Sequence, residues 1–374
     1  MKKLYVDQIK DRDEVEGVFL LRNLTLAVAK NGKPYLVLKI IDRTGEIEGR
    51  VWDNADLLAK SFAKDDFIFL RGRASLYMEK MQVVVKEMRR QDETTVDLAD
   101  FLPVSQFGRG DLESRLRLKI SKISASHFRA LMESFLERPG FLDDYCTAPA
   151  AKSMHHAYLA GLLEHSLAVA DLAETICQQY GDMHCDLLIV GALLHDVGKI
   201  RELQYRRSFE YTDVGKLLGH IILGVQMVDE QLAEIDAFPE SDAVHLKHLL
   251  LSHHGQYEFG SPKRPKTVEA VILSYADDLD SKINGIRTHL SKEKHSSSAW
   301  TGYHRLYDQY FYKGEQDEAR IEPEIEVSAP PMSKPKTAVS RGAQPLGATL
   351  ADRLKTAKIG LPVVSSSGDK SDEN

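Results

Sequence analysis

The sequence predicts two folded domains of different classes, a small five-stranded β-barrel and an all-α helical domain, followed by a disordered tail. Three observations support this order: short β-rich runs at the start, a long region of helical hydrophobic periodicity, and a final Pro-rich region without periodicity. A chain of 374 residues exceeds one typical domain, which suits two domains and a tail. The predicted boundaries are 1–92 for the barrel, 93–117 for a linker, 118–314 for the helical domain and 315–374 for the tail.

The composition is that of an ordinary water-soluble protein, with 43% hydrophobic residues, 28% charged residues and a net charge of −7. No apolar stretch reaches transmembrane length and the N-terminus lacks a signal-peptide core, so we expect a cytoplasmic protein without membrane contact. The cysteines Cys146, Cys177 and Cys185 form no Cys-x-x-Cys pair, which argues against a zinc ribbon or a disulfide framework. Residues 1–90 carry a net charge of +4, which makes this part the better candidate for meeting a polyanion.

The first 92 residues contain five short runs rich in β-branched and aromatic residues, separated by turn signals such as Asn31-Gly32. A short helix is predicted at 55–62, between the third and fourth runs. Five strands with a helix at this place follow the element order of an OB-fold barrel, although other small barrels share the pattern. The predicted strands span residues 15–22, 35–41, 46–52, 67–73 and 81–85.

Alternation along these strands separates an inward face from an outward face. If Leu36, Leu38 and Ile40 fill the barrel, the residues between them point outward, and the other strands divide in the same way. Interleaved rings and cations on one sheet face favour single-stranded nucleic acid, because bases stack on rings while phosphates meet Lys and Arg. Packing of the rings under a neighbouring domain is an equal alternative. The predicted outward residues are Tyr35, Lys39, Arg50, Trp52, Phe69, Arg71 and Arg73.

The helical domain is organised around the apolar run Leu187 to Leu194, which suits a buried helix and leads directly into His195-Asp196. Adjacent helix positions point about 100° apart, so this pair can grip one cation from two directions or place the carboxylate between two cations. Gly198 is predicted to break the helix, and Lys199 is expected to bring an ammonium close to the metal. A buried, hydrogen-bonded pair is the structural alternative.

More histidines and a carboxylate lie among apolar residues of successive predicted helices, where an unpaired ionisable group is costly. A single such histidine is more often a structural core residue than a ligand. Several of them on successive helices, together with His195-Asp196, favour a shared metal site. They are His165, His220, His253, His254 and Asp277. The predicted helices span residues 126–137, 159–180, 186–197, 217–235, 241–252 and 268–283.

The order of these residues resembles the HD superfamily of metal-dependent phosphohydrolases over about residues 150–285. With the OB-like domain and the phrases His155-His-Ala-Tyr-Leu-Ala-Gly-Leu-Leu-Glu-His165 and His253-His-Gly, the whole chain resembles the YhaM family of 3′-to-5′ exoribonucleases. Asp280, three residues beyond Asp277 on nearly the same helix face, is an alternative last ligand. The resemblance implies one metal ion held by His165, His195, Asp196 and Asp277, and a second held by Asp196 as a bridge with His220 and with His253, His254 or both.

By this resemblance the protein is a metal-dependent exonuclease that hydrolyses single-stranded RNA, with single-stranded DNA as a further substrate, to nucleoside 5′-monophosphates. Two divalent ions per subunit are expected, manganese first and cobalt, iron, nickel or zinc as alternatives, because imidazole with carboxylate suits these better than calcium. Asp196 would act as the catalytic bridge, and Lys199 would neutralise charge on the phosphoryl group. His156 is a candidate to orient substrate or donate a proton, with a structural role as its alternative.

Some alternatives stay open at this level. The basic residues Arg206 and Arg207 are either phosphate contacts or part of a solvated loop, and a homo-oligomer is compatible with the sequence. The same metal centre could hydrolyse a small nucleotide, such as a cyclic dinucleotide or a nucleoside triphosphate, although the Gly-Tyr-Pro signature of cyclic-dinucleotide HD enzymes is missing after His254. A nucleic-acid-binding protein with a purely structural HD domain is the other rival. There is no P-loop and no Gly-x-Ser-x-Gly motif, so nucleotide-driven motion and serine hydrolysis do not compete.

Overall fold

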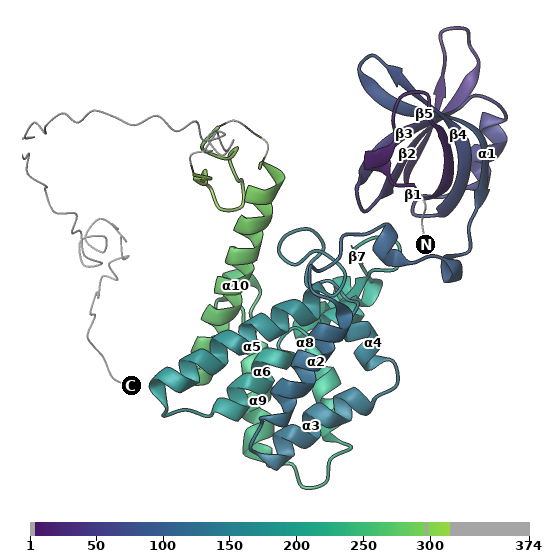
Figure 1. Ribbon diagram of the computed structural model, residues 1–374. Helices are drawn as coiled ribbons and strands as arrows, with labels where there is room; N and C mark the ends of the chain where they lie inside the picture. The colour runs from purple at the N-terminus through teal and green to yellow at the C-terminus, as the bar shows by residue number, and fades with distance from the viewer. Residues whose placement is uncertain (1–3, 295, 297, 315–374) are drawn as a thin grey trace, which may run out of the picture. The chain divides into compact units, whose positions relative to one another are not determined.

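The computed structural model describes residues 4–294, 296 and 298–314, and these form a closed five-stranded barrel and an α-helical domain (Figure 1). The predicted fold class is confirmed for both domains. The predicted disordered tail, 315–374, lies outside the described residues. None of the helices in the described part of the chain combines the length and the apolar character that crossing a membrane requires.

The barrel closes in the order β1-β2-β3-β5-β4, which is the five-stranded arrangement expected for an OB-fold. The neighbouring strands are antiparallel except for β3 and β5, which run parallel. Each predicted run is a strand, with bounds that differ from the prediction only at the ends. The elements are β1 Glu14–Val28, β2 Pro34–Asp42, β3 Gly45–Val51, α1 Ala55–Ser61, β4 Phe67–Tyr77 and β5 Lys80–Arg90.

The predicted alternation of inward and outward side chains on β2 is correct. Leu36, Leu38 and Ile40 are fully buried in the barrel, whereas Lys39 between them is exposed. Strand β1 is long enough to pair with β4 along its first half and with β2 along its second half, and an irregularity in register between Leu21 and Asn23 divides the two halves. Such a local kink bends a strand, which helps a short sheet close on itself.

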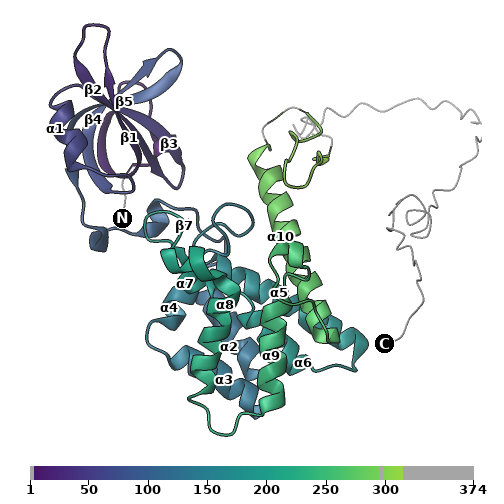
Figure 2. The ribbon, with the colours of Figure 1, turned by 180° about the vertical axis from the view of Figure 1, so that it is seen from behind.

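In the helical domain, α5 and α6 lie between α2 and α3 on one side and α10 on the other, as both ribbon views show (Figures 1 and 2). The apolar run predicted to be a buried helix is α6, and its leucines have no more than 2% of their surface exposed. The helices are α2 Arg109–Ser121, α3 Ser126–Glu137, α4 Phe141–Tyr145, α5 Gly161–Tyr180, α6 Cys185–Leu194, α7 Lys199–Glu202, α8 Asp213–Leu232, α9 Glu240–Ser252 and α10 Val268–Lys292; short strands β6 Leu203–Gln204 and β7 Glu210–Tyr211 pair between α7 and α8.

Helix α2 begins inside the segment predicted as a linker. Gly108 stands at its N-cap, and the helix buries Leu112, Leu116 and Ile120 at a spacing of four residues. Gly110 lies in the first turn, where it interrupts the helical pattern in the sequence without ending the helix. The helical region therefore starts at Arg109, earlier than the apolar periodicity indicates.

Gly198 serves a different purpose from the predicted one. Its φ of −62° and ψ of −19° lie in the ordinary right-handed region, so no helix break depends on it. A Cβ atom at this position would lie 2.0 Å from the carbonyl oxygen of His220 and 2.5 Å from the amide of Gly224. Glycine is required here because the turn after α6 packs directly against the backbone of α8, and this contact brings His220 beside the His195-Asp196 pair.

Candidate metal centre

Five segments of the helical domain bring the predicted metal ligands together around the end of α6. This end is buried, because the apolar side chains of α6 fill the centre of the domain and carry the residues that follow the helix inward with them. The ligand candidates are His165 on α5, His195 and Asp196 after α6, His220 on α8, His253 and His254 after α9, and Asp277 on α10.

The first group of ligand atoms surrounds the Nε2 atom of His165. This atom lies 3.2 Å from His195 Nε2, 3.1 Å from an Asp277 carboxylate oxygen and 3.6 Å from Oδ2 of Asp196. The His195 Nε2 atom lies 3.4 Å from the same Asp196 oxygen and 3.8 Å from Asp277. Two ligand atoms that share an ion at a bond length of about 2.1 Å are roughly 3.0–3.5 Å apart, so these four side chains fit one divalent ion.

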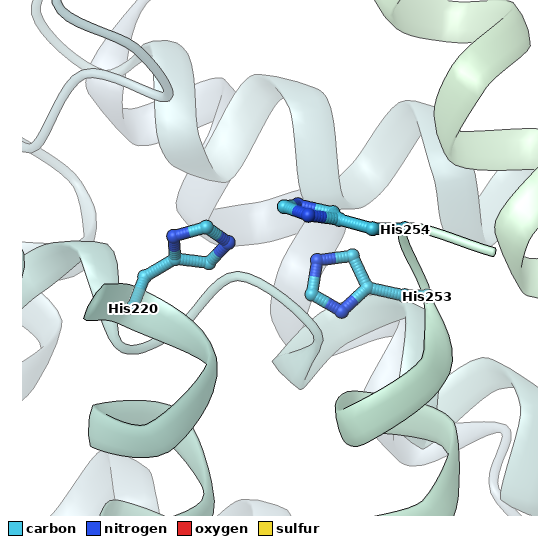
Figure 3. A group of neighbouring side chains, drawn as sticks. All are labelled: His220, His253 and His254. Atoms are coloured by element: carbon cyan, nitrogen blue, oxygen red, sulfur yellow. The ribbon is translucent and has the colours of Figure 1, made fainter. Parts of the chain in front are cut away.

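The second group faces the other oxygen of Asp196. Oδ1 lies 3.4 Å from His220 Nε2 and 3.6 Å from His253 Nε2, and all three atoms are buried without a hydrogen-bond partner. Figure 3 shows the rings of His220, His253 and His254 turned toward a common space, and one ligand atom from each lies within 4.8 Å of the others. Buried polar atoms without a partner are costly, and a bound cation would satisfy all of them at once. These residues therefore fit a second ion with Asp196 between the two.

In each of the five candidate ligand histidines, Nδ1 is hydrogen-bonded to an oxygen atom. Since a carbonyl or carboxylate can only accept, Nδ1 donates in these bonds, and Nε2 is the nitrogen available to a metal. Burial lowers the pKa of His253 and His254, so both rings are neutral at pH 7. The partners are Asp280 for His165 at 2.7 Å, the Ala192 carbonyl for His195 at 2.8 Å, Glu202 for His220 at 3.1 Å, the Leu250 carbonyl for His253 at 2.7 Å and the Phe259 carbonyl for His254 at 2.8 Å.

His220 reaches this position because α8 is interrupted just before it. Gly219 has φ +74°, which only glycine adopts without strain, and the kink turns the next residue toward Glu202. The Glu202 carboxylate then accepts hydrogen bonds from both the backbone amide and the ring Nδ1 of His220, at 2.9 and 3.1 Å. Sequence reasoning missed Glu202, since a lone acid in a short turn shows no pattern that would distinguish it.

The two candidates for the last carboxylate ligand lie on opposite sides of the His165 ring. Asp277 faces Nε2 and the other ligand atoms, whereas Asp280 accepts hydrogen bonds from Nδ1 of His165 at 2.7 Å and from Nε2 of His156 at 2.9 Å. A metal shared by Asp280 and His165 would bind Nδ1, and with another ion at Nε2 the ring would have to be fully deprotonated. The geometry therefore favours Asp277 as the ligand and Asp280 as the group that orients the His165 ring.

His156 lies behind the ligands rather than in the cavity in front of them. Only 3% of it is exposed, and its ring is held by Asp280 on one nitrogen and by the Tyr158 hydroxyl, 2.8 Å away, on the other. The neighbouring His155 lines the cavity instead. Burial lowers the pKa of His155 to about 3, so this ring is neutral at pH 7. The predicted proton donor His156 therefore does not line the cavity, whereas its neighbour His155 does.

Lys199 is buried against the bridging carboxylate, with its ammonium 2.5 Å from Oδ2 of Asp196. Burial opposes charge on both groups, but pairing with Lys199 and His195 holds the pKa of Asp196 well below its usual range, and Asp196 raises the pKa of Lys199. Both groups are therefore charged at neutral pH. Lys199 also lines the cavity, so its charge can act on an anion that enters there.

Replacing Asp280 with alanine is expected to weaken Mn²⁺ binding about 10- to 100-fold, the usual effect of removing a carboxylate that orients a metal-bound histidine. Isothermal titration of purified protein with Mn²⁺ measures this. The matched control is Asp213→Ala, which removes an exposed acid at the start of α8 and should leave the affinity unchanged. An unchanged affinity in Asp280→Ala would contradict the orienting role.

The predicted nucleic-acid face of the barrel contains one preformed group of rings and cations. The Tyr35 and Trp52 rings stack with centroids 4.7 Å apart, and 45% of Trp52 is exposed. The Arg50 guanidinium lies 5.9 Å from the Tyr35 ring and 5.4 Å from the ring of Tyr77, a residue that the sequence did not single out. The Trp52 side chain is thus about half open, and Tyr35 supplies one of its contacts.

The remaining predicted residues on this face differ in how their charges are compensated. Arg71 makes two hydrogen bonds to Glu16, and Lys39 pairs with Glu46 at 2.8 Å. Arg73 is exposed and has no carboxylate partner among the described residues. The partly exposed Phe69 ring carries the Arg89 guanidinium 4.5 Å from its centroid. Exposed ion pairs are weak and exchange easily, so these cations remain available to a phosphate.

The two arginines predicted near the metal site are exposed. Arg207 forms an ion pair with Glu93 at 2.6 Å, whereas Arg206 has no carboxylate partner within the described part of the chain. Neither lines the cavity in front of the metal ligands; both border a smaller cavity of about 440 Å³ with Lys64 and Tyr205. The structure therefore does not bring them to the ligand cluster.

Two domain-family models match the two domains of the chain. Residues 162–282 match the HD domain model, and residues 15–90 match a model described as an OB-fold nucleic acid binding domain. Among solved structures, the yeast S. cerevisiae mitochondrial single-stranded DNA binding protein Rim1 aligns over 22% of this chain and 95% of its own, with a TM-score of 0.20 and 15% identity. The HD domain of the L. monocytogenes phosphodiesterase PgpH aligns over 39% of this chain and 74% of its own, with a TM-score of 0.27 and 20% identity.

The family assignment depends on a relative that matches along most of the chain. The 3′-5′ exoribonuclease YhaM of Geobacillus sp. (strain WCH70) is 33% identical over 302 residues, which cover 80% of this chain and 92% of the relative. The aligned length is too great for either domain alone, so the match includes the barrel and the helical domain together. The chain belongs to the YhaM family of 3′-5′ exoribonucleases.

Proposed function

We propose that this protein is a metal-dependent exoribonuclease that removes nucleotides from the 3′ end of single-stranded RNA and releases nucleoside 5′-monophosphates. The observation that carries the proposal is the bridging position of Asp196, whose two carboxylate oxygens face two separate groups of ligand atoms. A pair of adjacent cations suits phosphodiester hydrolysis, and family membership points to RNA as the substrate.

We propose two divalent ions, with manganese as the first choice, because mixed imidazole and carboxylate ligands suit Mn, Co, Fe, Ni and Zn. When bound by these residues, two such ions would supply the charge needed to lower the pKa of a water molecule and to bind phosphate oxygens. The proposed ligands of one ion are His165, His195, Asp196 and Asp277, and those of the other are Asp196, His220, His253 and His254.

The residues of the chain then have distinct tasks. Asp196 holds the two ligand groups together, and Lys199 offsets negative charge that develops on the phosphoryl group. His155, neutral and at the cavity wall, is better situated than His156 to contact substrate, and it would do so as a hydrogen-bonding ring. On the barrel, the Tyr35–Trp52 stack and Arg50 support our proposal that this face holds the single strand by stacking and phosphate contacts.

The proposed function is tested by incubating the protein with 5′-end-labelled single-stranded RNA and Mn²⁺ and resolving the products over time. A 3′-to-5′ exonuclease produces a ladder of labelled fragments that shorten one nucleotide at a time, and nucleoside 5′-monophosphates accumulate. A matched DNA oligonucleotide tests the second proposed substrate. Internal cuts from the first time point, or hydrolysis of a cyclic dinucleotide or nucleoside triphosphate without any RNA ladder, would contradict the proposal.

A further inference from the structure

The metal centre opens into a cavity that is larger than a phosphate group needs. Its volume is about 1090 Å³, and its walls include Asp196, Lys199 and Asp277. Pockets of roughly 300–1,000 Å³ enclose whole drug-sized molecules, so this cavity has room for bases and sugars as well as the scissile phosphodiester. Besides the metal centre, it is lined by the segment 255–265 and by one face of α10.

Two aromatic rings from these walls are strongly exposed. Phe259, in the segment that follows α9, has 67% of its surface exposed, and Tyr275 on α10 has 73% exposed. Large rings that remain open inside a concave site are available for stacking, whereas rings that only stabilise the fold are covered by their neighbours.

Both rings are tied to the metal ligands by the backbone. The Phe259 carbonyl accepts the hydrogen bond from Nδ1 of His254 at 2.8 Å, so any shift of this segment would also turn a ligand. Tyr275 lies on the same helix as Asp277, in a stripe with Val271 and Asp278 that also lines the cavity. A base that stacks on either ring would therefore lie in the cavity into which the metal centre opens.

Among the described residues, the cavity also contains one cation without a carboxylate partner. Lys199 pairs with Asp196 at 2.5 Å and Lys282 pairs with Asp278 at 2.6 Å. Arg264 has no carboxylate partner among the described residues; its guanidinium lies 5.2 Å from the centroid of the Tyr257 ring. Stacking on this ring orients the guanidinium without consuming its charge, which leaves Arg264 suited to bind a phosphate.

We infer that Phe259, Tyr275 and Arg264 form a nucleotide subsite of this cavity. The rings stack a base of the nucleotides that flank the scissile phosphodiester, and Arg264 binds a neighbouring phosphate of the strand. Because every base presents a π-face, the subsite accepts all four nucleotides. The inference rests on the proposed function and adds to it the residues that hold the RNA end at the metals.

The test compares two short RNAs of equal length, one intact and one that lacks both bases flanking the terminal phosphodiester. Tyr275→Ala should raise the apparent KM for the intact RNA about 5- to 150-fold, because the variant loses the binding free energy of one stacked base. For the base-less RNA the same variant should change KM less than about twofold, because the lost partner is absent already. Tyr275→Phe keeps a ring and should restore a KM close to that of the wild type.

Arg264→Ala adds an independent readout. If Arg264 contacts one phosphate, its removal should reduce the slope of log affinity against log salt concentration by about 0.7, the value for one contact with a single strand. The control variant is Tyr180→Ala, an equally exposed tyrosine at the end of α5 that does not line the cavity, and it should leave both RNAs unaffected. Mn²⁺ content of each variant confirms that the metal centre is intact.

The outcomes separate this inference from the proposed function. If the wild type degrades RNA but Tyr275→Ala slows the intact and base-less RNAs equally, Tyr275 supports Asp277 rather than a base, and the inference is overturned alone. If the wild type binds Mn²⁺ yet degrades no RNA, the proposed function fails and the subsite fails with it. A base-dependent rise of KM in Tyr275→Ala, together with a reduced salt slope in Arg264→Ala, supports the roles of Tyr275 and Arg264 in the subsite.

Discussion

Asp196→Ala is expected to abolish hydrolysis of RNA and to remove most of the bound Mn²⁺. One oxygen of this carboxylate faces His165 and His195, and the other faces His220 and His253, so its loss affects both ligand groups at once. Removing a residue that only supports a metal ligand lowers metal affinity or activity about 10- to 100-fold. Removing the bridging carboxylate should lower both by more than this. Hydrolysis rates with labelled RNA, together with metal analysis of the purified variant, measure the two effects.

The substitution also removes the partner of a buried ammonium group, which makes a folding control necessary. Asp196→Asn keeps the shape and one oxygen acceptor and should fold normally, while its uncharged amide binds a divalent ion poorly. In both variants the barrel should unfold at the same temperature as in the wild type. Activity within about tenfold of the wild type, the range of a supporting residue, would refute the two-metal arrangement.

Lys199→Met is expected to lower kcat by about 10²- to 10³-fold, the effect of removing one group that stabilises charge in a transition state. Methionine keeps most of the length and apolar volume of the lysine stem, so packing around the turn after α6 is preserved. Because the change removes a positive charge 2.5 Å from Asp196, Mn²⁺ binding should not weaken and should strengthen if the ammonium competes with the ions.

This pairing of a reduced kcat with undiminished metal affinity distinguishes Lys199 from the metal ligands and from Asp280. Single-turnover kinetics at saturating Mn²⁺ and calorimetric titration give the two quantities. Lys216→Met, which removes an exposed lysine on α8, serves as the control and should change neither. A loss of Mn²⁺ affinity in Lys199→Met parallel to the loss of rate would show that Lys199 supports the centre instead of acting on the substrate.

Much of the fold could be predicted from the sequence because it depends on local patterns. The alternation of Leu36, Leu38 and Ile40 places one strand face in the barrel, and the apolar run of α6 can only be buried. The start of α2 could not be read correctly, since Gly108 and Gly110 interrupt the pattern although a glycine at an N-cap and in a first turn is compatible with a helix.

The candidate site was predictable in its residue types but not in its connections. Histidines among apolar residues and the His195-Asp196 pair indicate a metal site, because burial of unpaired ionisable groups is costly. Whether Asp277 or Asp280 faces the ligands depends on the rotation of α10 against the His165 ring, and the two lie nearly one helical turn apart. The position of His156 behind the ligands depends on its hydrogen bonds to Asp280 and Tyr158. Asp280 is far away in the sequence, and no sequence pattern indicates the bond to Tyr158.

By itself, then, the sequence determines a barrel followed by a helical domain, the apolar helix at its centre and the set of residues able to bind metal. Only the tertiary structure decides that Asp196 lies between two groups of candidate ligands, that Glu202 and Asp280 accept hydrogen bonds from His220 and His165, and that Phe259, Tyr275 and Arg264 share one cavity. The reason is physical: propensity and periodicity act between residues a few positions apart, whereas a metal centre is made by close packing of segments far apart in the chain, as at Gly198 against α8.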